Sequence, residues 1–166
     1  MRSFELIIMN IALVAHDSRK EELREWVEYN LNALKEHTLY ATGTTGKLLE
    51  EILDLREGVE FTEETLYPLK GKINMLLSGP LGGDQQIGAM IAEGNIDLLI
   101  FFCDNLVTQG HHNDVSALTR LASLYNIAFA TNRTTADMIM TSPLLKDESY
   151  TKITPTAIKN YANRRL

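Results

Sequence analysis

Short apolar runs alternate with longer amphipathic stretches along this chain. Such alternation predicts successive βα units, in which parallel strands form one sheet and helices cover both of its faces. The expected fold class is therefore α/β. The apolar runs predict strands over residues 7–15, 38–42, 73–78, 96–102 and 127–131. The amphipathic stretches predict helices over about residues 18–35, 44–56, 84–93, 114–125 and 134–141, and a last helix from Pro155 to the C-terminus.

One polar segment does not fit this alternation. Residues 55–72, LREGVEFTEETLYPLKGK, separate the second predicted helix from the third strand with more chain than a compact βα connection needs. We interpret the segment as an insertion within a single domain that covers residues 1–166. A surface excursion, a lid and a contact between subunits are all open roles for it. Long surface loops are well tolerated, which favours the first.

Length and charge exclude several classes of protein. A chain of 166 residues is near the usual size of one domain, and its net charge of −6 is spread along the sequence, so nucleic-acid binding through a basic surface is not indicated. The longest apolar stretches are shorter than the roughly 20 residues that span a bilayer. Without a small-residue cleavage site near the N-terminus, the sequence predicts a cytoplasmic protein without a membrane partner. The single cysteine, Cys103, lies in an apolar run and is expected to be a buried thiol.

Polar residues directly follow every predicted strand. In open parallel sheets, ligands bind beyond the carboxyl ends of the strands, so these residues are expected to gather at one edge of the sheet. This convergence is a stronger signal for a site than any single motif. The residues are His16, Asp17, Lys20, Thr42, Thr44, Thr45, Ser78, Asp84, Asp104, His111 and Asp114.

The segment ATGTTGKLLEE joins the second strand to the second helix and has the composition of an anion-binding turn. Its glycines and threonines place backbone N–H groups and hydroxyls beside the positive end of a helix. The spacing of Gly43 and Gly46 fits neither the P-loop nor the dinucleotide fingerprint, which favours a small phosphate ester over a nucleotide. The alternative is that Thr44 or Thr45 only caps the helix. A second such turn at SGP and the compact charge of Lys20 favour phosphate.

Asp84 follows two glycines and begins a predicted helix. A first-turn acid is favoured by the helix dipole, so Asp84 has a purely structural interpretation as a helix cap. The functional alternative is that Gly82 and Gly83 let the backbone approach a ligand and direct the carboxylate into the site. A phosphate dianion bound nearby would raise the proton affinity of this carboxylate, which suits a general base acting on a carbon acid.

The loop after the fourth strand contains two adjacent histidines, His111 and His112, with Asp114 close by. A metal site is the less favoured interpretation, because no spaced set of further His or Cys ligands accompanies the pair. The favoured role for His111 is a neutral donor to a developing oxyanion, while His112 fits a solvated loop position. Asp114 also fits the N-cap of the following helix.

Four segments, IALVAHD, LYATGTTG, LSGPLGGDQQIGAMIAEGNIDLLIFF and NIAFATNRTTAD, closely resemble methylglyoxal synthases in order and spacing, over about residues 11–143. The resemblance implies a lyase that converts dihydroxyacetone phosphate to methylglyoxal and inorganic phosphate without metal or organic cofactor. It also implies a three-layer α/β/α fold with a five-stranded parallel sheet in Rossmann-like winding, and a homohexamer.

The same resemblance implies roles for individual residues. The catalytic base falls on Asp84, the histidine that polarises the carbonyl on His111, and a further acid on Asp114. The arginine that reaches a neighbouring subunit's phosphate site falls on Arg164 or Arg165. Substrate and phosphate contacts fall on His16, Asp17, Lys20, Thr42, Gly43, Thr44, Thr45, Ser78 and Gly79.

The chain departs from the family pattern at Cys103, at the HHND segment and by the insertion at 55–72, and none of these changes removes a chemical group from the site. Similar folds serve as regulatory ligand-binding domains in carbamoyl phosphate synthetases and as a cyclohydrolase domain in purine synthesis. A non-catalytic domain that binds phosphate or a nucleotide is therefore the alternative function. A structural or signalling α/β module is a third, because a fold by itself does not define an activity.

Overall fold

The computed structural model describes residues 7–106 and 112–164. Within these residues, five parallel strands form one sheet: β1 (Asn10–Ala15), β2 (Thr38–Thr42), β3 (Ile73–Leu76), β4 (Leu98–Phe102) and β5 (Ala128–Ala130). Their order across the sheet is β3-β2-β1-β4-β5, and each neighbouring pair is parallel. The predicted α/β class, with its five-stranded parallel sheet, is therefore confirmed.

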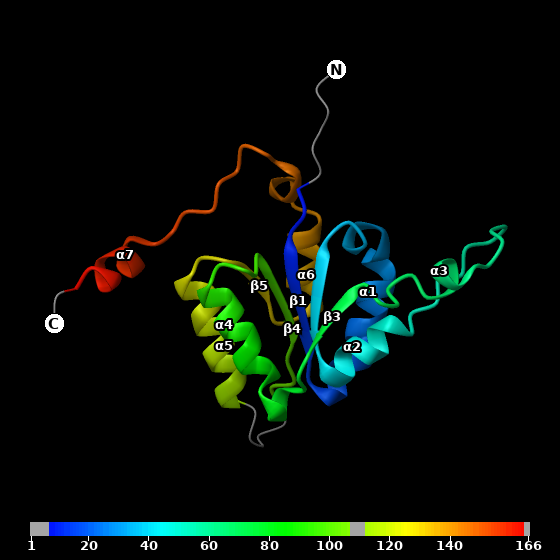
Figure 1. Cartoon of the computed structure of the whole chain (residues 1–166), viewed down its shortest axis with the longest axis horizontal. Helices are drawn as coiled ribbons and strands as arrows, with labels where there is room; N and C mark the ends of the chain where they lie inside the picture. The colour runs from blue at the N-terminus through cyan, green and yellow to red at the C-terminus, as the bar shows by residue number, and fades with distance from the viewer. Residues whose placement is uncertain (1–6, 107–111, 165–166) are drawn as a thin grey trace.

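Helices cover both faces of the sheet and make three layers (Figure 1). On one face, α1 (Lys20–Leu34), α2 (Gly43–Glu50) and α6 (Arg133–Met140) pack around a core that includes Trp26 and Leu49. The indole N–H of Trp26 donates to Asp137 over 2.8 Å and so joins α1 to α6. On the other face, α4 (Gly83–Ala92) and α5 (His112–Leu124) pack around Ile87 and Leu118.

The second helix is shorter than the sequence predicts. The apolar spacing predicted a helix over residues 44–56, whereas α2 ends at Glu50. The backbone N–H of Ile52 donates to the Leu49 carbonyl over 3.3 Å in a tighter turn, and the Ile52 side chain is fully buried outside the helix. The apolar position at residue 52 thus reflects burial in the core, and it does not continue the helix.

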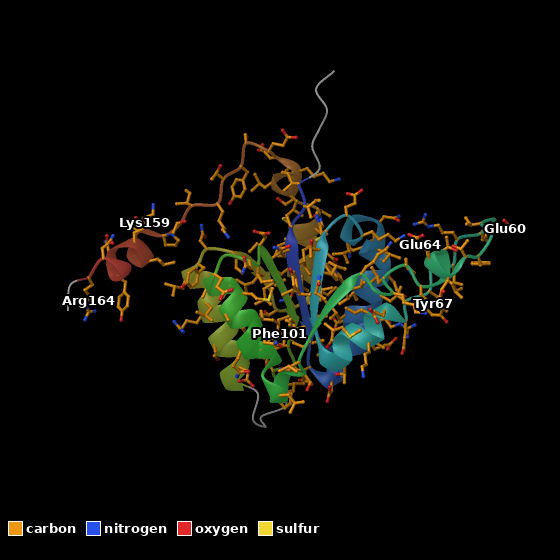
Figure 2. The ribbon with its side chains drawn as sticks, viewed as in Figure 1. Glu60, Glu64, Tyr67, Phe101, Lys159 and Arg164 are labelled. Atoms are coloured by element: carbon orange, nitrogen blue, oxygen red, sulfur yellow. The ribbon has the colours of Figure 1, made fainter. Side chains whose placement is uncertain are left out.

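The segment predicted as an insertion extends from the body of the molecule beside α2. It contains the short helix α3 (Glu63–Leu66), whose N-terminus is capped reciprocally by Thr62 and Thr65. Figure 2 shows Glu60, Glu64 and Tyr67 on this excursion, away from the sheet. Its return path is anchored, because Leu69 is fully buried in the core. The segment is therefore an exposed excursion with an apolar attachment point, a feature that its polar composition did not reveal.

The chain after α6 runs along the molecule and then leaves it on the side opposite α3 (Figure 1). This C-terminal arm, residues 147–164, ends in α7 (Thr156–Ala162) and exposes the apolar parts of Tyr150, Ile153 and Tyr161. The Asn126 side chain donates to the Ile153 carbonyl over 2.9 Å and so attaches the arm to the body at residue 153. No helix in the described parts of the chain has the length and apolar character needed to cross a membrane.

Candidate active site

A cavity of about 380 Å³ lies at the carboxyl edge of the sheet. Residues of β1 and β4 line it, and these two neighbouring strands are the point from which the chain winds to β2 in one direction and to β5 in the other. Open α/β sheets bind their ligands in the crevice at such a switch point. Residues from all of the first four strand ends line the cavity: Val14, Ala15, His16, Asp17, Ser18, Lys20, Thr42, Thr44, Thr45, Ser78, Gly79, Pro80, Asp84, Phe101, Asp104 and Asp114.

Four helices begin at this cavity, because each follows a strand that ends there. Lys20 is the first residue of α1, Thr44 and Thr45 lie in the first turn of α2, Asp84 in that of α4 and Asp114 in that of α5. The first N–H groups of a helix have no acceptor within the helix, and the helix dipole makes that end positive. The arrangement therefore favours an anion in the cavity.

Lys20 links two of the strand ends. Its ammonium group donates to the Thr44 hydroxyl over 2.5 Å and to the Asp17 carboxylate over 2.5 Å. The N-cap of α2 is Thr42, so Thr44 and Thr45 are not caps, and Thr45 is almost fully buried. Of the two sequence interpretations of this turn, capping by Thr44 or Thr45 is wrong, and both side chains line the cavity.

The Asp84 carboxylate is also placed in the cavity, and only 8% of the residue is exposed to solvent. The N-cap of α4 is Gly82, which has a φ of 108°, so the structure excludes Asp84 as the N-cap. A Cβ atom added to Gly79 would lie 3.0 Å from an Asp84 carboxylate oxygen. Glycine at residue 79 thus lets the carboxylate contact the backbone of the Ser78–Gly79 turn.

The ring of His16 has a defined orientation. Its Nδ1 atom accepts a hydrogen bond from the backbone N–H of Asp104 over 2.8 Å, and the ring meets Phe101 edge to face. An Nδ1 atom that accepts a bond carries no proton, so neutral His16 carries its proton on Nε2. The Ser18 hydroxyl donates to the Asp104 carboxylate over 2.5 Å, which holds the residue that orients the ring.

The structure brings most of the predicted site residues together, with the exceptions that follow. Gly43 does not line the cavity; its N–H donates to the Leu77 carbonyl over 3.3 Å. Arg164 lies on the C-terminal arm against Tyr161, far from the cavity of its own chain (Figure 2). The predicted donor His111 and the alternative Arg165 lie outside the described residues.

Three features that the sequence did not single out lie in the site or next to its turns. Ser18 was visible only as part of the polar HDSRK segment, and its bond to Asp104 joins residues far apart in the chain. The backbone N–H of Leu77 donates to the Gln86 side chain over 2.8 Å. Phe101 provides an apolar wall beside His16. None of these pairings has a signature in local spacing.

Cys103 points away from the cavity into the core of the α4 and α5 face. Burial raises the pKa of its thiol to about 11, and the thiol donates to the Phe101 carbonyl over 3.2 Å. The predicted buried thiol is confirmed. Within the described ranges, no group of three or more His, Cys, Asp or Glu side chains has an arrangement suited to a metal ion.

These features define an α/β protein whose small-molecule site lies at the switch point of a parallel sheet, among helix N-termini that favour an anion. A family model described as "MGS-like domain" matches residues 22–131. The chain is 49% identical over 159 residues to the methylglyoxal synthase of Maridesulfovibrio salexigens, across 96% of this chain and 98% of the relative. It is 51% identical over 144 residues to that of Proteus mirabilis, across 87% and 84%.

A solved structure is also similar to this fold. The crystal structure of methylglyoxal synthase from Elizabethkingia anophelis NUHP1 matches it with a TM-score of 0.76 and 42% identity, over 96% of this chain and 93% of that one. The chain belongs to the methylglyoxal synthase family, a family of enzymes.

Proposed function

We propose that the chain acts as a carbon–oxygen lyase that converts dihydroxyacetone phosphate to methylglyoxal and inorganic phosphate. The observation that carries the proposal is the meeting of a nearly buried carboxylate, Asp84, with a set of helix N-termini and Lys20 in one cavity. Helix N-termini and a lysine suit the phosphate group, and a carboxylate at the same site suits removal of a proton from carbon. The names of the relatives support the same reaction.

In the first step, Asp84 removes a proton from the hydroxymethyl carbon of the substrate, and the electron pair moves onto the ketone oxygen to give an enediolate. Donors near that oxygen stabilise the charge as it develops. We assign this role to His111, as the resemblance implies, and assign Nε2–H of His16 to a second substrate oxygen. Asp114, in the first turn of α5, is proposed as a further acid in the same cavity.

In the second step, the hydroxyl group of the enediolate becomes an aldehyde, the double bond moves toward the phosphate-bearing carbon, and the C–O bond breaks with its electron pair going to phosphate. The hydroxyl proton leaves with phosphate, and the proton held by Asp84 returns to the enolate oxygen. The resulting enol tautomerises to methylglyoxal. Proton and electron-pair shifts complete both steps, so the proposal includes no cofactor.

The phosphate orientation decides which reaction follows enediolate formation. Elimination requires the C–O bond to stand out of the enediolate plane, where it overlaps the π system. We propose that Lys20, the first turn of α2 and the Ser78–Gly79 turn hold the phosphate in that orientation. If the C–O bond lay in that plane, the enediolate would only take a proton back at carbon.

The direct test is to incubate the purified protein with dihydroxyacetone phosphate and to measure methylglyoxal and phosphate together, with substrate alone as the control for spontaneous decay. We expect equal amounts of both products above that control. Binding of phosphate without release of either product would contradict the proposal, and it would favour the non-catalytic regulatory domain.

Lys20→Met is expected to lower kcat/KM by about 10- to 100-fold, because it removes one charge-assisted hydrogen bond to the substrate phosphate. Lys47→Met is the matched control, since Lys47 is exposed on α2 and does not line the cavity. Steady-state kinetics of both variants provide the measurement. Equal kcat/KM values for the two variants would show that Lys20 does not bind the substrate phosphate.

The C-terminal arm supports the homohexamer that the family resemblance implies. The arm leaves the body of its own chain (Figure 1), and Tyr150, Ile153 and Tyr161 on it are exposed. We propose that the arm contacts a second copy and that Arg164 approaches the phosphate site there. Sedimentation of the purified protein is expected to give the mass of a hexamer, and a monomer at micromolar concentration would contradict this assignment.

A further inference from the structure

Both backbone polar groups of Leu77, the N–H and the carbonyl, form hydrogen bonds outside the sheet ladder. Strand β3 ends at Leu76, so the next N–H no longer belongs to the ladder of the sheet and needs another acceptor. That acceptor is the side-chain oxygen of Gln86, at 2.8 Å. The Leu77 carbonyl accepts from the N–H of Gly43 over 3.3 Å. The N–H of Leu77 is therefore bonded to α4, and its carbonyl is bonded to the start of α2.

Leu77 immediately precedes the turn proposed to hold phosphate. The Ser78 carbonyl accepts from the N–H of Gly83 over 3.0 Å, and a Cβ atom added to Gly43 would lie 2.9 Å from the Cα atom of Ser78. The turn thus packs directly against the start of α2. Any displacement of Leu77 moves the Ser78–Gly79 turn relative to both helices.

Gln86 also belongs to the helix that carries the proposed base. It lies two residues after Asp84 on α4, and its bond to Leu77 spans nine residues. The adjacent Gln85 is exposed on the same turn of the helix but is not the acceptor for Leu77. One glutamine of the DQQ segment therefore ties the base-bearing helix to the phosphate turn.

We propose that Gln86 is a positioning residue that fixes the phosphate turn relative to Asp84, and so commits the enediolate to loss of phosphate instead of return of a proton to carbon. This inference rests on the proposed function. Gln86 acts through the Leu77 peptide and does not line the cavity. A shift of about 1 Å in the position of a bound group relative to a catalytic residue can change a rate by about 10²-fold.

The two fates of the intermediate leave different products. Loss of phosphate breaks the C–O bond and gives methylglyoxal. Return of a proton to the hydroxymethyl carbon restores dihydroxyacetone phosphate, and in D₂O a deuteron exchanged onto Asp84 marks that carbon. The amount of deuterium in recovered substrate, divided by the methylglyoxal formed, reports the partition directly.

The test compares Gln86→Met with Gln85→Met, which both replace the amide with a side chain of similar length that is a weak acceptor. For Gln86→Met we expect the ratio of deuterium exchange to methylglyoxal to rise several-fold, with kcat for methylglyoxal reduced more than the exchange rate. Gln85→Met is expected to keep the wild-type ratio. Gln86→Glu retains an oxygen acceptor and is expected to return the ratio toward the wild-type value.

The outcomes separate this inference from the proposed function. If wild-type protein forms no methylglyoxal, the proposed function fails before Gln86 is tested. If wild-type protein is active and the ratio in Gln86→Met equals that in Gln85→Met, the positioning role is overturned, even where both activities have fallen together. That last result would assign Gln86 to general stability of the fold.

Discussion

Asp84→Asn is expected to lower kcat for methylglyoxal formation by about 10² to 10⁴, the usual contribution of a general base. Asparagine keeps the size of the side chain but has no electron pair of comparable basicity for a carbon-bound proton. The substitution leaves the positive helix ends and Lys20 in place. Binding of inorganic phosphate is therefore expected to remain, which separates loss of chemistry from loss of the site.

Glu93→Gln provides the matched control for Asp84→Asn. Glu93 is the C-cap of the same helix and is exposed, and its carboxylate accepts a hydrogen bond from the side chain of Asn95 over 3.1 Å. Its replacement removes one carboxylate from α4 far from the cavity, so kcat should stay within about two-fold of wild type, as for surface substitutions. Turnover by Asp84→Asn at the rate of Glu93→Gln would show that Asp84 is a first-turn acid with no part in proton transfer.

Gly83→Ala is expected to destabilise the protein by about 3 kcal/mol or more, at the upper end of the cost of overpacking. A Cβ atom at residue 83 would lie 2.0 Å from the Leu77 carbonyl oxygen, a backbone atom that cannot move alone. Either α4 or the phosphate turn must shift. Urea-induced unfolding at a fixed protein concentration measures the change, and activity should fall more than the folded fraction does because Asp84 follows directly.

Gly88→Ala is the control on the same helix. A Cβ atom at residue 88 would lie 3.2 Å from Cδ1 of Leu121, the end of a flexible side chain on α5. Alanine also favours a helix interior over glycine by up to about 1 kcal/mol, which offsets a small packing change. We expect Gly88→Ala to stay within about 1 kcal/mol of wild type. Equal stability of the two variants would mean that the turn at Leu77 adjusts without cost.

Continuous burial along an element made it predictable from the sequence, as β4 illustrates. All five residues of β4 are buried, so a short continuous apolar run located that strand to within two residues. The end of α2 was missed because Ile52 is buried outside a helix, and apolar spacing responds to burial alone. Leu69 was missed for the opposite reason, since one buried leucine in a polar segment leaves no periodic pattern.

The candidate site was predictable where it depends on topology. Strand ends of a parallel sheet share one edge, so Lys20, Thr44 and Asp84 were expected together before any contact was seen. The side-chain pairings were not predictable in the same way. Bonds such as that between Ser18 and Asp104 depend on rotamers and on segments far apart in the chain, which no local spacing encodes. The roles of Asp84, His111 and Asp114 stay predictions.

The burial of Cys103 has a consequence for the lifetime of the enzyme. Methylglyoxal is a reactive dicarbonyl, and its aldehyde carbon adds to thiolates. This chain contains one cysteine, and burial raises the pKa of its thiol to about 11, so the thiol is mostly protonated at pH 7. Cys103 follows β4 directly and packs in the core cluster on the α4 and α5 face, whereas Phe102 packs in the cluster on the other face. Because Cys103 does not line the site cavity and its thiol stays mostly protonated, we expect the product to modify it slowly.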